Sequence, residues 1–377
     1  MTHPRRILYV QYVNPGIYPP LEQSSLLLAE AGWQVRFVGT RAMGESDNLA
    51  FPPHPSVRVY RLPWYPPGGL PLKLHYIVFV AWAVLWAVLW RPRWVYLSDP
   101  NSTPVGVVLA WLGITLIYHE HDTPATTVRV VGRCRRAVGR QAAVCVLPNS
   151  VRAARFAAEV GRTKPVTVVL NCPRRAEVGP TRRAVVLGGL RLLYSGSIVP
   201  DRLPEAVIRA VASVSTVRLE VIGYETVGSR GYVARLRRVA EELGAADRVV
   251  FGPARPRHRL WAAIRACDVG LALLPAVTND PNLSAMPGAS VKVFDYLAAG
   301  LGVLLTDRQE WGAEYLDTGL ARGCDPADQA SVAAALHWFV DRPSEVRAMG
   351  ERGRQRVLVD WNYETQFEPV KRVLEAL

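Results

Sequence analysis

Several short polar segments of the chain directly follow apolar runs, where their side chains and amides would be available to a ligand. The richest is Tyr118-His119-Glu120-His121-Asp122. Histidines two positions apart on an extended segment point the same way, so they could bind a metal, cap a strand end or hydrogen-bond a substrate. The sequence shows no third metal ligand nearby, which favours contact with a substrate. Further polar segments in this position are Asn149, Asn171, Gly196-Ser197 and Gly223-Tyr224-Glu225.

The apolar runs before these segments alternate with helical stretches. The first run, 6–13, is followed by a Pro/Gly loop and a helical stretch over 21–31. Such alternation is typical of a parallel sheet covered on both faces. Further runs lie at 34–38, 57–61, 94–97, 114–119, 143–147 and 166–170, and a second series lies at 192–195, 217–222, 249–251, 269–273 and 303–306. Parallel sheets bind ligands at the carboxyl ends of their strands, where the polar segments are expected.

The length of 377 residues favours two domains. Segment 173–189 is rich in Pro, Gly and Arg and lacks apolar periodicity, which predicts a linker. We therefore expect an N-terminal Rossmann-like domain over 1–172 and a second one over 190–360. Loops after the strands of both domains would line a central cleft.

The composition excludes a disordered chain, since 50% of the residues are hydrophobic and only 20% are charged. The formal net charge of +13 fits nucleic acid or an anionic membrane as a partner. Because no helix-turn-helix, RNA-binding aromatic motif or zinc pattern accompanies the charge, nucleic acid is not expected. The five cysteines are scattered, and no signal-peptide core precedes the first strand, so a cytoplasmic protein is expected.

Two segments point to a membrane surface. Residues 76–90 are all apolar, and cations flank them. A 15-residue helix rises about 22 Å against a hydrocarbon core of about 30 Å, so this segment is too short to span. It is either a core helix or a helix lying in the membrane interface. The helical stretch 128–141 carries arginines that are either solvated or contact anionic lipid, namely Arg129, Arg133, Arg135, Arg136 and Arg140.

The most specific stretch, 290–304, begins Ser290-Val291-Lys292-Val293-Phe294-Asp295-Tyr296. It resembles the Lys-x-x-Glu-Tyr-x-Ala-x-Gly segment of retaining glycosyltransferases with the GT-B fold, particularly family 4. In that family the segment opens a helix beside the donor nucleotide, and its acid hydrogen-bonds the ribose; the resemblance gives this role to Asp295. A carboxylate accepts both ribose hydroxyls, and Lys292 one turn earlier offers charge to a diphosphate. The family's second acid, seven residues upstream, is replaced by Gly288.

The segment Tyr194-Ser195-Gly196-Ser197 with Asp201-Arg202 is similar to the family's phosphate site. Arg202 matches the family's lysine, whereas Ser197 replaces its arginine, so Arg202 and Lys292 would carry the β-phosphate. His121-Asp122 matches the family's His-acid pair. Residues 360–364 are similar to the family's closing segment, which implies that the helix over 361–377 crosses back to the N-terminal domain.

The resemblance implies an α/β GT-B glycosyltransferase that moves a sugar from a nucleotide-diphosphate-sugar to a polysaccharide or lipid-linked saccharide. Retention of configuration and independence from metals and cofactors are implied as well, at the cytoplasmic face of a bacterial membrane. A nucleotide-sugar 2-epimerase and a non-catalytic membrane-peripheral scaffold are the alternatives. The expected site residues are His121, His119 and Asp122 for catalysis, Gly196, Ser197, Arg202, Gly223, Tyr224, Lys292 and Asp295 for the donor, and Asn14, Gly16 and Asn149 for the acceptor or cleft.

Overall fold

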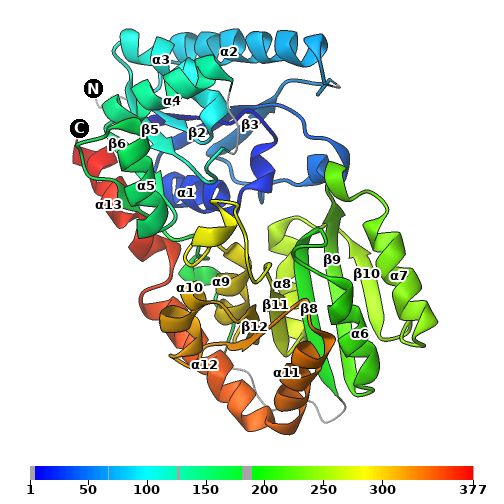
Figure 1. Ribbon diagram of the computed structural model, residues 1–377. Helices are drawn as coiled ribbons and strands as arrows, with labels where there is room; N and C mark the ends of the chain where they lie inside the picture. The colour runs from blue at the N-terminus through cyan, green and yellow to red at the C-terminus, as the bar shows by residue number, and fades with distance from the viewer. Residues whose placement is uncertain (1–4, 67, 125–127, 181–188, 377) are drawn as a thin grey trace. The chain divides into compact units, whose positions relative to one another are not determined.

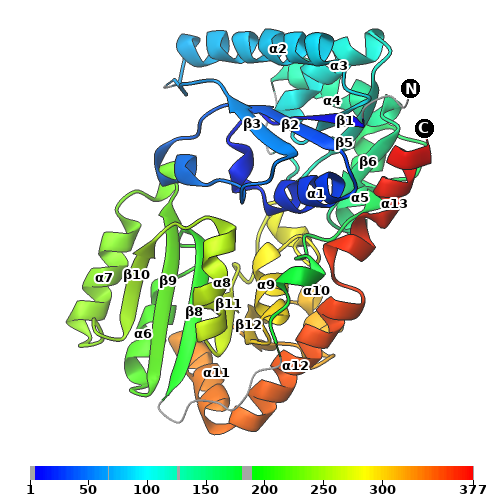
Figure 2. The same cartoon turned by 180° about the vertical axis from the view of Figure 1, so that it is seen from behind.

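The computed structural model describes residues 5–66, 68–124, 128–180 and 189–376, which form two compact units. Unit 1 comprises Met1–Asn171 and Tyr363–Leu377, and unit 2 comprises Cys172–Asn362. Each unit has its own parallel sheet covered by helices, as Figures 1 and 2 show. The predicted α/β class with two parallel sheets is confirmed. Of the predicted linker, residues 181–188 lie outside the described residues.

Unit 1 is built on a seven-stranded sheet of order β3-β2-β1-β4-β5-β6-β7. Apolar runs such as Trp94–Leu97 are buried along their whole length, because helices cover both faces of the sheet. The strands are β1 Arg6–Val10, β2 Gln34–Gly39, β3 Val57–Arg61, β4 Trp94–Leu97, β5 Thr115–His119, β6 Val144–Leu147 and β7 Thr167–Val168. The helices are α1 Pro19–Glu30, α2 Leu70–Trp90, α3 Thr103–Trp111, α4 Arg129–Gln141, α5 Ser150–Val160 and α13 Tyr363–Ala376.

The main core of unit 1 lies between the sheet and the helices α2 to α5. Phe79 of α2, Leu109 of α3, Val138 of α4 and Phe156 of α5 belong to one buried cluster with the strands. On the other face α1 packs against α13 (Figure 2). The loops at the carboxyl ends of β1 and β5 are thereby fixed on a rigid support.

Unit 2 has a six-stranded sheet of order β10-β9-β8-β11-β12-β13. One hydrophobic cluster joins its strands to α6, α7 and α11. The strands are β8 Leu190–Ile198, β9 Val217–Glu225, β10 Val249–Pro253, β11 Val269–Ala272, β12 Gly302–Thr306 and β13 Arg322–Cys324. The helices are α6 Glu205–Ser213, α7 Tyr232–Glu242, α8 Arg257–Ala266, α9 Val291–Ala298, α10 Gln309–Trp311, α11 Gln329–Asp341 and α12 Pro343–Val359.

Two elements are longer than expected. β8 and β9 stay paired through Ile198 and Glu225, so Gly196-Ser197 and Gly223-Tyr224 lie inside strands and not in loops after them. α2 begins at Leu70 and not at residue 76, since Pro71 is compatible with the first turn and Gly69 takes the left-handed φ of +87° before it. The length argument against a spanning helix was therefore wrong, because 21 residues are enough to cross a bilayer.

Candidate functional site

β8 and β9 each carry a glycine at the predicted donor edge of unit 2. Gly196 pairs with Gly223 in the sheet register. A Cβ on Gly223 would lie 1.8 Å from the carbonyl oxygen of Gly196, and Gly196 itself has φ of +117°. A Cβ on Gly196 would meet Cε of Lys292 at 2.9 Å. Glycine at 196 therefore lets the Lys292 side chain cross the strand backbone at close range, and glycine at 223 leaves room for the Gly196 carbonyl.

Lys292 and Arg202 bring two positive charges to this edge. The Lys292 ammonium lies 4.2 Å from the centroid of the Tyr194 ring, and Arg202 donates from Nη1 to Oγ of Ser197 at 2.9 Å. Burial and the neighbouring Arg202 charge hold the pKa of Lys292 well below its usual range. Burial also raises the pKa of Tyr224, which the Arg202 charge opposes.

Neither of these cations has a carboxylate partner among the residues that the structure describes. Two like charges held close together without a counter-ion are stabilised by an incoming anion. A diphosphate supplies two such charges and several acceptor oxygens. The predicted phosphate-binding residues Gly196, Ser197, Arg202 and Lys292 are thus brought together by the fold.

Asp295, on the buried side of α9, is held by a second arginine. Its Oδ1 accepts from Nη2 of Arg257 at 2.6 Å, and Nη1 of the same guanidinium donates to Glu177. Trp261 Nε1 donates to that Glu177 carboxylate at 3.3 Å. Burial raises the pKa of Asp295 to about 6, although Arg257 lowers it. In the described chain no donor to Oδ2 of Asp295 is found, so this oxygen is available to hydroxyls of a ligand.

Gly288 shows why the family's upstream acid has no counterpart here. Its φ is +79°, a conformation that residues with a side chain rarely adopt, and its N–H donates to the Tyr315 hydroxyl at 3.4 Å. A carboxylate at this position would strain the backbone. Glycine in place of the family's acid therefore goes together with a backbone conformation that favours glycine.

The two histidines lie together at the carboxyl end of β5 in unit 1. Their ring centroids are 3.9 Å apart, and His121 also stacks on Tyr18 at 5.1 Å. His119 is fully buried, and its Nδ1 pairs with the Tyr96 hydroxyl at 2.7 Å. Burial and the Arg152 charge lower the pKa of His121 to about 3, so its ring is neutral. Both ring nitrogens of His121 are buried without a hydrogen-bond partner in the described structure.

The other predicted residues near the histidines have partners within unit 1. Glu120 accepts from the Tyr118 hydroxyl at 2.6 Å and from Nε and Nη2 of Arg135, so its carboxylate stabilises the fold. Asp122 keeps 68% of its side chain exposed and pairs with Arg152 at 3.3 Å. Asn149 caps α5 by accepting from the Arg152 backbone N–H at 2.8 Å. No group of three or more His, Cys, Asp or Glu suited to a metal occurs in the part of the chain that is described.

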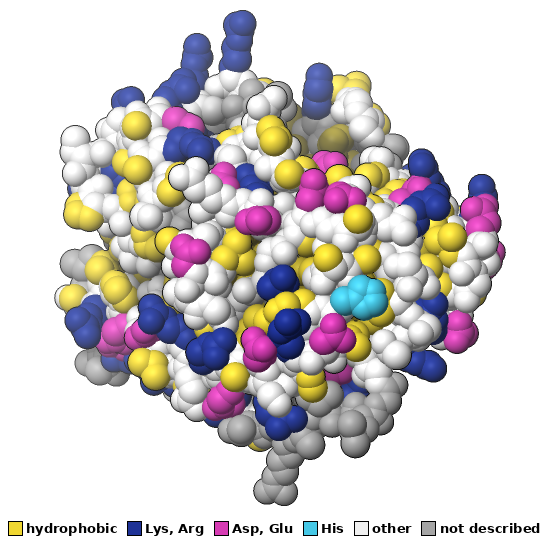
Figure 3. Space-filling model, turned by 60° about the horizontal axis from the view of Figure 1, so that its bottom comes forward, with side chains coloured by type: hydrophobic (Ala, Val, Ile, Leu, Met, Phe, Trp, Pro, Cys, Tyr) yellow, Lys and Arg dark blue, Asp and Glu magenta, His cyan; other side chains and the backbone are white. Residues whose placement is uncertain are grey.

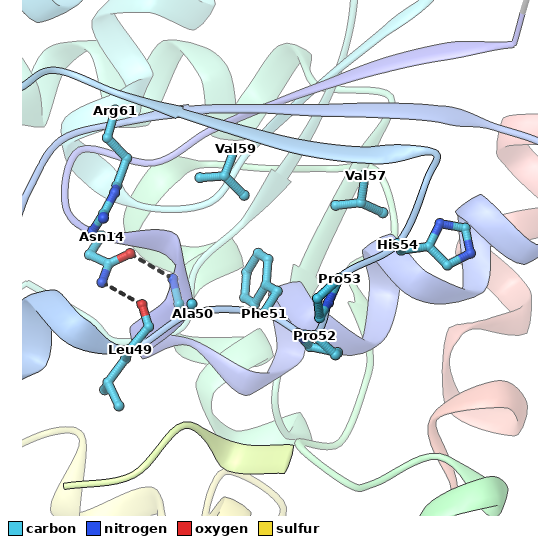
Figure 4. A pocket seen from close by; sticks show the side chains of 11 residues that line it. Asn14, Leu49, Ala50, Phe51, Pro52, Pro53, His54, Val57, Val59 and Arg61 are labelled. Atoms are coloured by element: carbon cyan, nitrogen blue, oxygen red, sulfur yellow. Dashed lines mark hydrogen bonds between the residues drawn. The ribbon is translucent and has the colours of Figure 1, made fainter. Parts of the chain in front are cut away.

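Asn14 and Gly16 line a pocket of about 270 Å³ beside β3 (Figure 4). The Asn14 amide donates to the carbonyl of Leu49 at 2.9 Å and accepts from the Gly16 N–H at 3.1 Å. Asn14 therefore shapes the pocket by joining two loops. The wall opposite is apolar, with Phe51 and Val57 among its residues.

Two family models match the chain. One, described as a glycosyl transferase 4-like domain, matches residues 22–172, and one described as glycosyl transferase-like matches residues 202–371. Together they span most of both units. The chain is a GT-B glycosyltransferase of the family 4 type.

The named relatives of this glycosyltransferase are glycosyltransferases as well. The D-inositol 3-phosphate glycosyltransferase of Stackebrandtia nassauensis is 29% identical over 370 residues, which covers 86% of this chain and 79% of that protein. The GDP-mannose-dependent α-(1-6)-phosphatidylinositol monomannoside mannosyltransferase of Mycolicibacterium smegmatis is 24% identical and covers 68% of this chain and 69% of its own. These matches favour a transferase over the epimerase and the scaffold.

The solved structures confirm the fold of the glycosyltransferase. Anabaena HepE, solved with UDP and glucose, superimposes with a TM-score of 0.71 at 15% identity, over 99% of this chain and all of its own. The sequence analysis singled out Lys292 and Asp295 but not Glu177, Arg257 and Trp261, which form the hydrogen-bonded network at Asp295. Glu177 lies in the predicted linker and Arg257 in an Arg-rich stretch, and neither position carries a motif.

Proposed function

We propose that the glycosyltransferase holds the diphosphate of a nucleotide-sugar on Arg202 and Lys292, and its ribose on Asp295. The observation that carries the proposal is the pair of cations at Gly196 without a carboxylate partner in the described chain. Negative charge develops on the leaving diphosphate in the transition state, where two preorganised cations stabilise it most. This arrangement supports transfer without a metal. Retention of configuration is proposed from the family resemblance.

The proposed acceptor is a saccharide, free or lipid-linked, bound by unit 1. Two relatives are named for phosphorylated inositol acceptors, and one of these acceptors is a phosphatidylinositol mannoside. We assign His121 to hydrogen bonds with the reacting sugar, because its neutral ring has both nitrogens unpaired among the described residues. His119 and Asp122 are proposed to support it. A cytoplasmic enzyme at the inner face of the membrane fits such an acceptor.

Calorimetric titration with UDP, GDP and their glucose and mannose conjugates tests the donor site. Loss of one hydrogen-bonded charge costs about 1.5–3 kcal/mol, so Arg202→Ala and Lys292→Ala should each weaken nucleotide binding about 10- to 150-fold. Arg238→Ala removes an exposed cation from α7 of the same unit and should leave binding unchanged. Wild-type affinity in both site variants, with normal melting curves, would refute the proposal.

Incubation of the nucleotide-sugar alone separates transfer from epimerisation. The proposed transferase hydrolyses the donor slowly until an acceptor is added. Formation of the 2-epimer without acceptor would contradict transfer as the activity.

A further inference from the structure

Apart from Lys73 in its first turn, the outer face of α2 is apolar. The helix buries one stripe, which includes Phe79, Ala83 and Ala87, in the core of unit 1. On the surface of a globular domain the opposite stripe would be polar. Here it carries seven large apolar side chains that are 45 to 73% exposed, namely Leu70, Leu74, Ile77, Val78, Leu85, Val88 and Leu89. Figures 1 and 2 show α2 as the outermost layer of this unit.

The neighbouring helices extend this apolar surface. α3 packs against both α2 and α4. At the end of α3, Trp111 is 85% and Leu112 is 57% exposed, and Val128 and Val130 are exposed at the start of α4. An apolar area of this kind, spread over adjacent helices, marks a surface that something covers. We call the exposed residues of α2, Trp111 and Leu112 the docking face.

The charges around the docking face have one sign. The sequences of α2, α3 and α4 contain no acidic residue. Arg129, Arg133, Arg136 and Arg140 are all exposed and follow one another at helical spacing along α4. By contrast, cationic and acidic side chains are mixed on the face that Figure 3 shows. A surface that combines apolar side chains with unopposed arginines complements an anionic bilayer.

The packing of α2 against its own domain argues against a helix that crosses a bilayer. Among the described helices, α2 is the one long and apolar enough to span by length and composition. Its inner stripe, however, is part of the core between helix and sheet, and Phe79 is fully buried. Leaving the sheet would expose that core. The arrangement therefore fits a helix that lies flat in the interface with its outer stripe among the lipids.

The first turns of α2 are joined to the carboxyl edge of the sheet in unit 1. The Tyr12 hydroxyl pairs with Nδ1 of His75 at 3.3 Å, and the Tyr12 ring meets that of Tyr76 edge-on at 4.9 Å. The backbone N–H of Tyr12, just after β1, donates to Asp99 after β4 at 2.8 Å. His119 ends β5 and His121 follows it at this same edge. A docked α2 thus holds the proposed acceptor edge at the level of lipid headgroups.

We propose that the docking face binds an anionic bilayer surface, so that the enzyme meets its acceptor in the membrane plane. The inference deepens the proposed function and rests on its lipid-linked acceptor. The arginines of α4 contact lipid phosphates, and the outer stripe of α2 inserts among the acyl chains. Neither group belongs to the proposed donor site.

Flotation with vesicles tests the docking face. The full chain is mixed with phosphatidylcholine vesicles containing about 30 mol% phosphatidylglycerol, or none, at low and at high salt. The wild type should float with the anionic vesicles, and less of it should do so at high salt. Leu85→Glu combined with Leu89→Glu should weaken vesicle binding roughly tenfold or more. The single substitutions Arg129→Gln, Arg133→Gln and Arg136→Gln should each weaken it roughly fivefold.

Val277→Glu with Val359→Glu is the matched control, because both side chains are exposed and apolar but lie in unit 2. Wild-type flotation of the Leu85/Leu89 variant, or no flotation of the wild type at low salt, would overturn the proposal. Self-association that the same variant abolishes, in the absence of vesicle binding, would assign the face to a second copy instead. UDP titration of each variant should match the wild type, which separates failure of docking from failure of the donor site.

Discussion

Replacement of Asp295 by Asn should stabilise unit 2 while it weakens donor binding. Burial raises the pKa of Asp295 from 3.8 to about 6, so the folded protein disfavours the ionised form. Each pKa unit is worth about 1.4 kcal/mol, and ionised Asp295 therefore costs unit 2 on the order of 3 kcal/mol near neutral pH. Asn has the shape of the protonated acid without this cost, and Arg257 keeps Glu177 as a partner.

The pH dependence of this gain follows from the direction of the pKa. A raised carboxyl pKa gives stability that is fully present below about pH 4 and is lost as the pH rises through about 6. The advantage of Asp295→Asn should thus be largest above about pH 7 and shrink towards zero near pH 4. For a domain of this size, 3 kcal/mol corresponds to a rise in Tm of about 6–12 °C at most.

Melting curves of wild type and variant across this pH range, with UDP titration at about pH 7.5, are the assay. UDP binding should weaken roughly tenfold or more, because a charged acceptor for the ribose is lost. Asp268→Asn is the control, since this buried carboxylate of unit 2 accepts from the Arg191 N–H at 2.9 Å and should only lose stability. An Asp295→Asn protein that melts below the wild type at every pH would refute the reasoning.

Two further predictions concern the strand glycines and the histidine pair. Gly223→Ala should lower the free energy of unfolding by about 3 kcal/mol or more and abolish UDP binding, because its Cβ would overlap the Gly196 carbonyl. Gly228→Ala is the control, since a Cβ at that position meets open space. Equal melting temperatures of the two variants would contradict this prediction. The ring-proton resonances of His121 should stay constant between about pH 5 and pH 8, since its pKa is lowered to about 3; an NMR midpoint near 6.5 would contradict the buried neutral ring.

β4 has the expected bounds, Trp94–Leu97, because an apolar run that is buried along its whole length marks it. β3 has the expected bounds, Val57–Arg61, as well, although it is an edge strand with partly exposed residues; there the alternation of Val and Tyr with Arg marks the strand. β13, Arg322–Cys324, was missed, since three residues with an Arg and a Gly have no apolar pattern. Pairing with β12 makes it a strand. Tertiary pairing of this kind leaves no trace in local sequence.

Candidate site residues could be predicted where one short segment carries them. Lys292 and Asp295 lie one turn apart on α9, so a motif could assign both. The partners of Asp295 could not be found this way, because Arg257 is 38 residues from Asp295 and 80 from Glu177 in the chain. Their contacts depend on how the fold brings α8, α9 and the segment before β8 together. Spacing rules carry no information about such a network.

Hydrogen-bond satisfaction separates binding groups from structural ones in both units. The buried Glu120 carboxylate is fully engaged by Arg135 and Tyr118, and such a group contributes to folding and needs no ligand. Lys292 is held at a lowered pKa beside Arg202, and Asp295 at a raised one, so both destabilise the protein that contains them. A bound anion would offset the cost of the buried Lys292 charge, and hydroxyl donors would offset that of the Asp295 carboxylate. The cost is understandable if these groups bind a nucleotide-sugar. The ring of His121, which has no partner among the residues that the structure describes, satisfies the same criterion for a sugar hydroxyl.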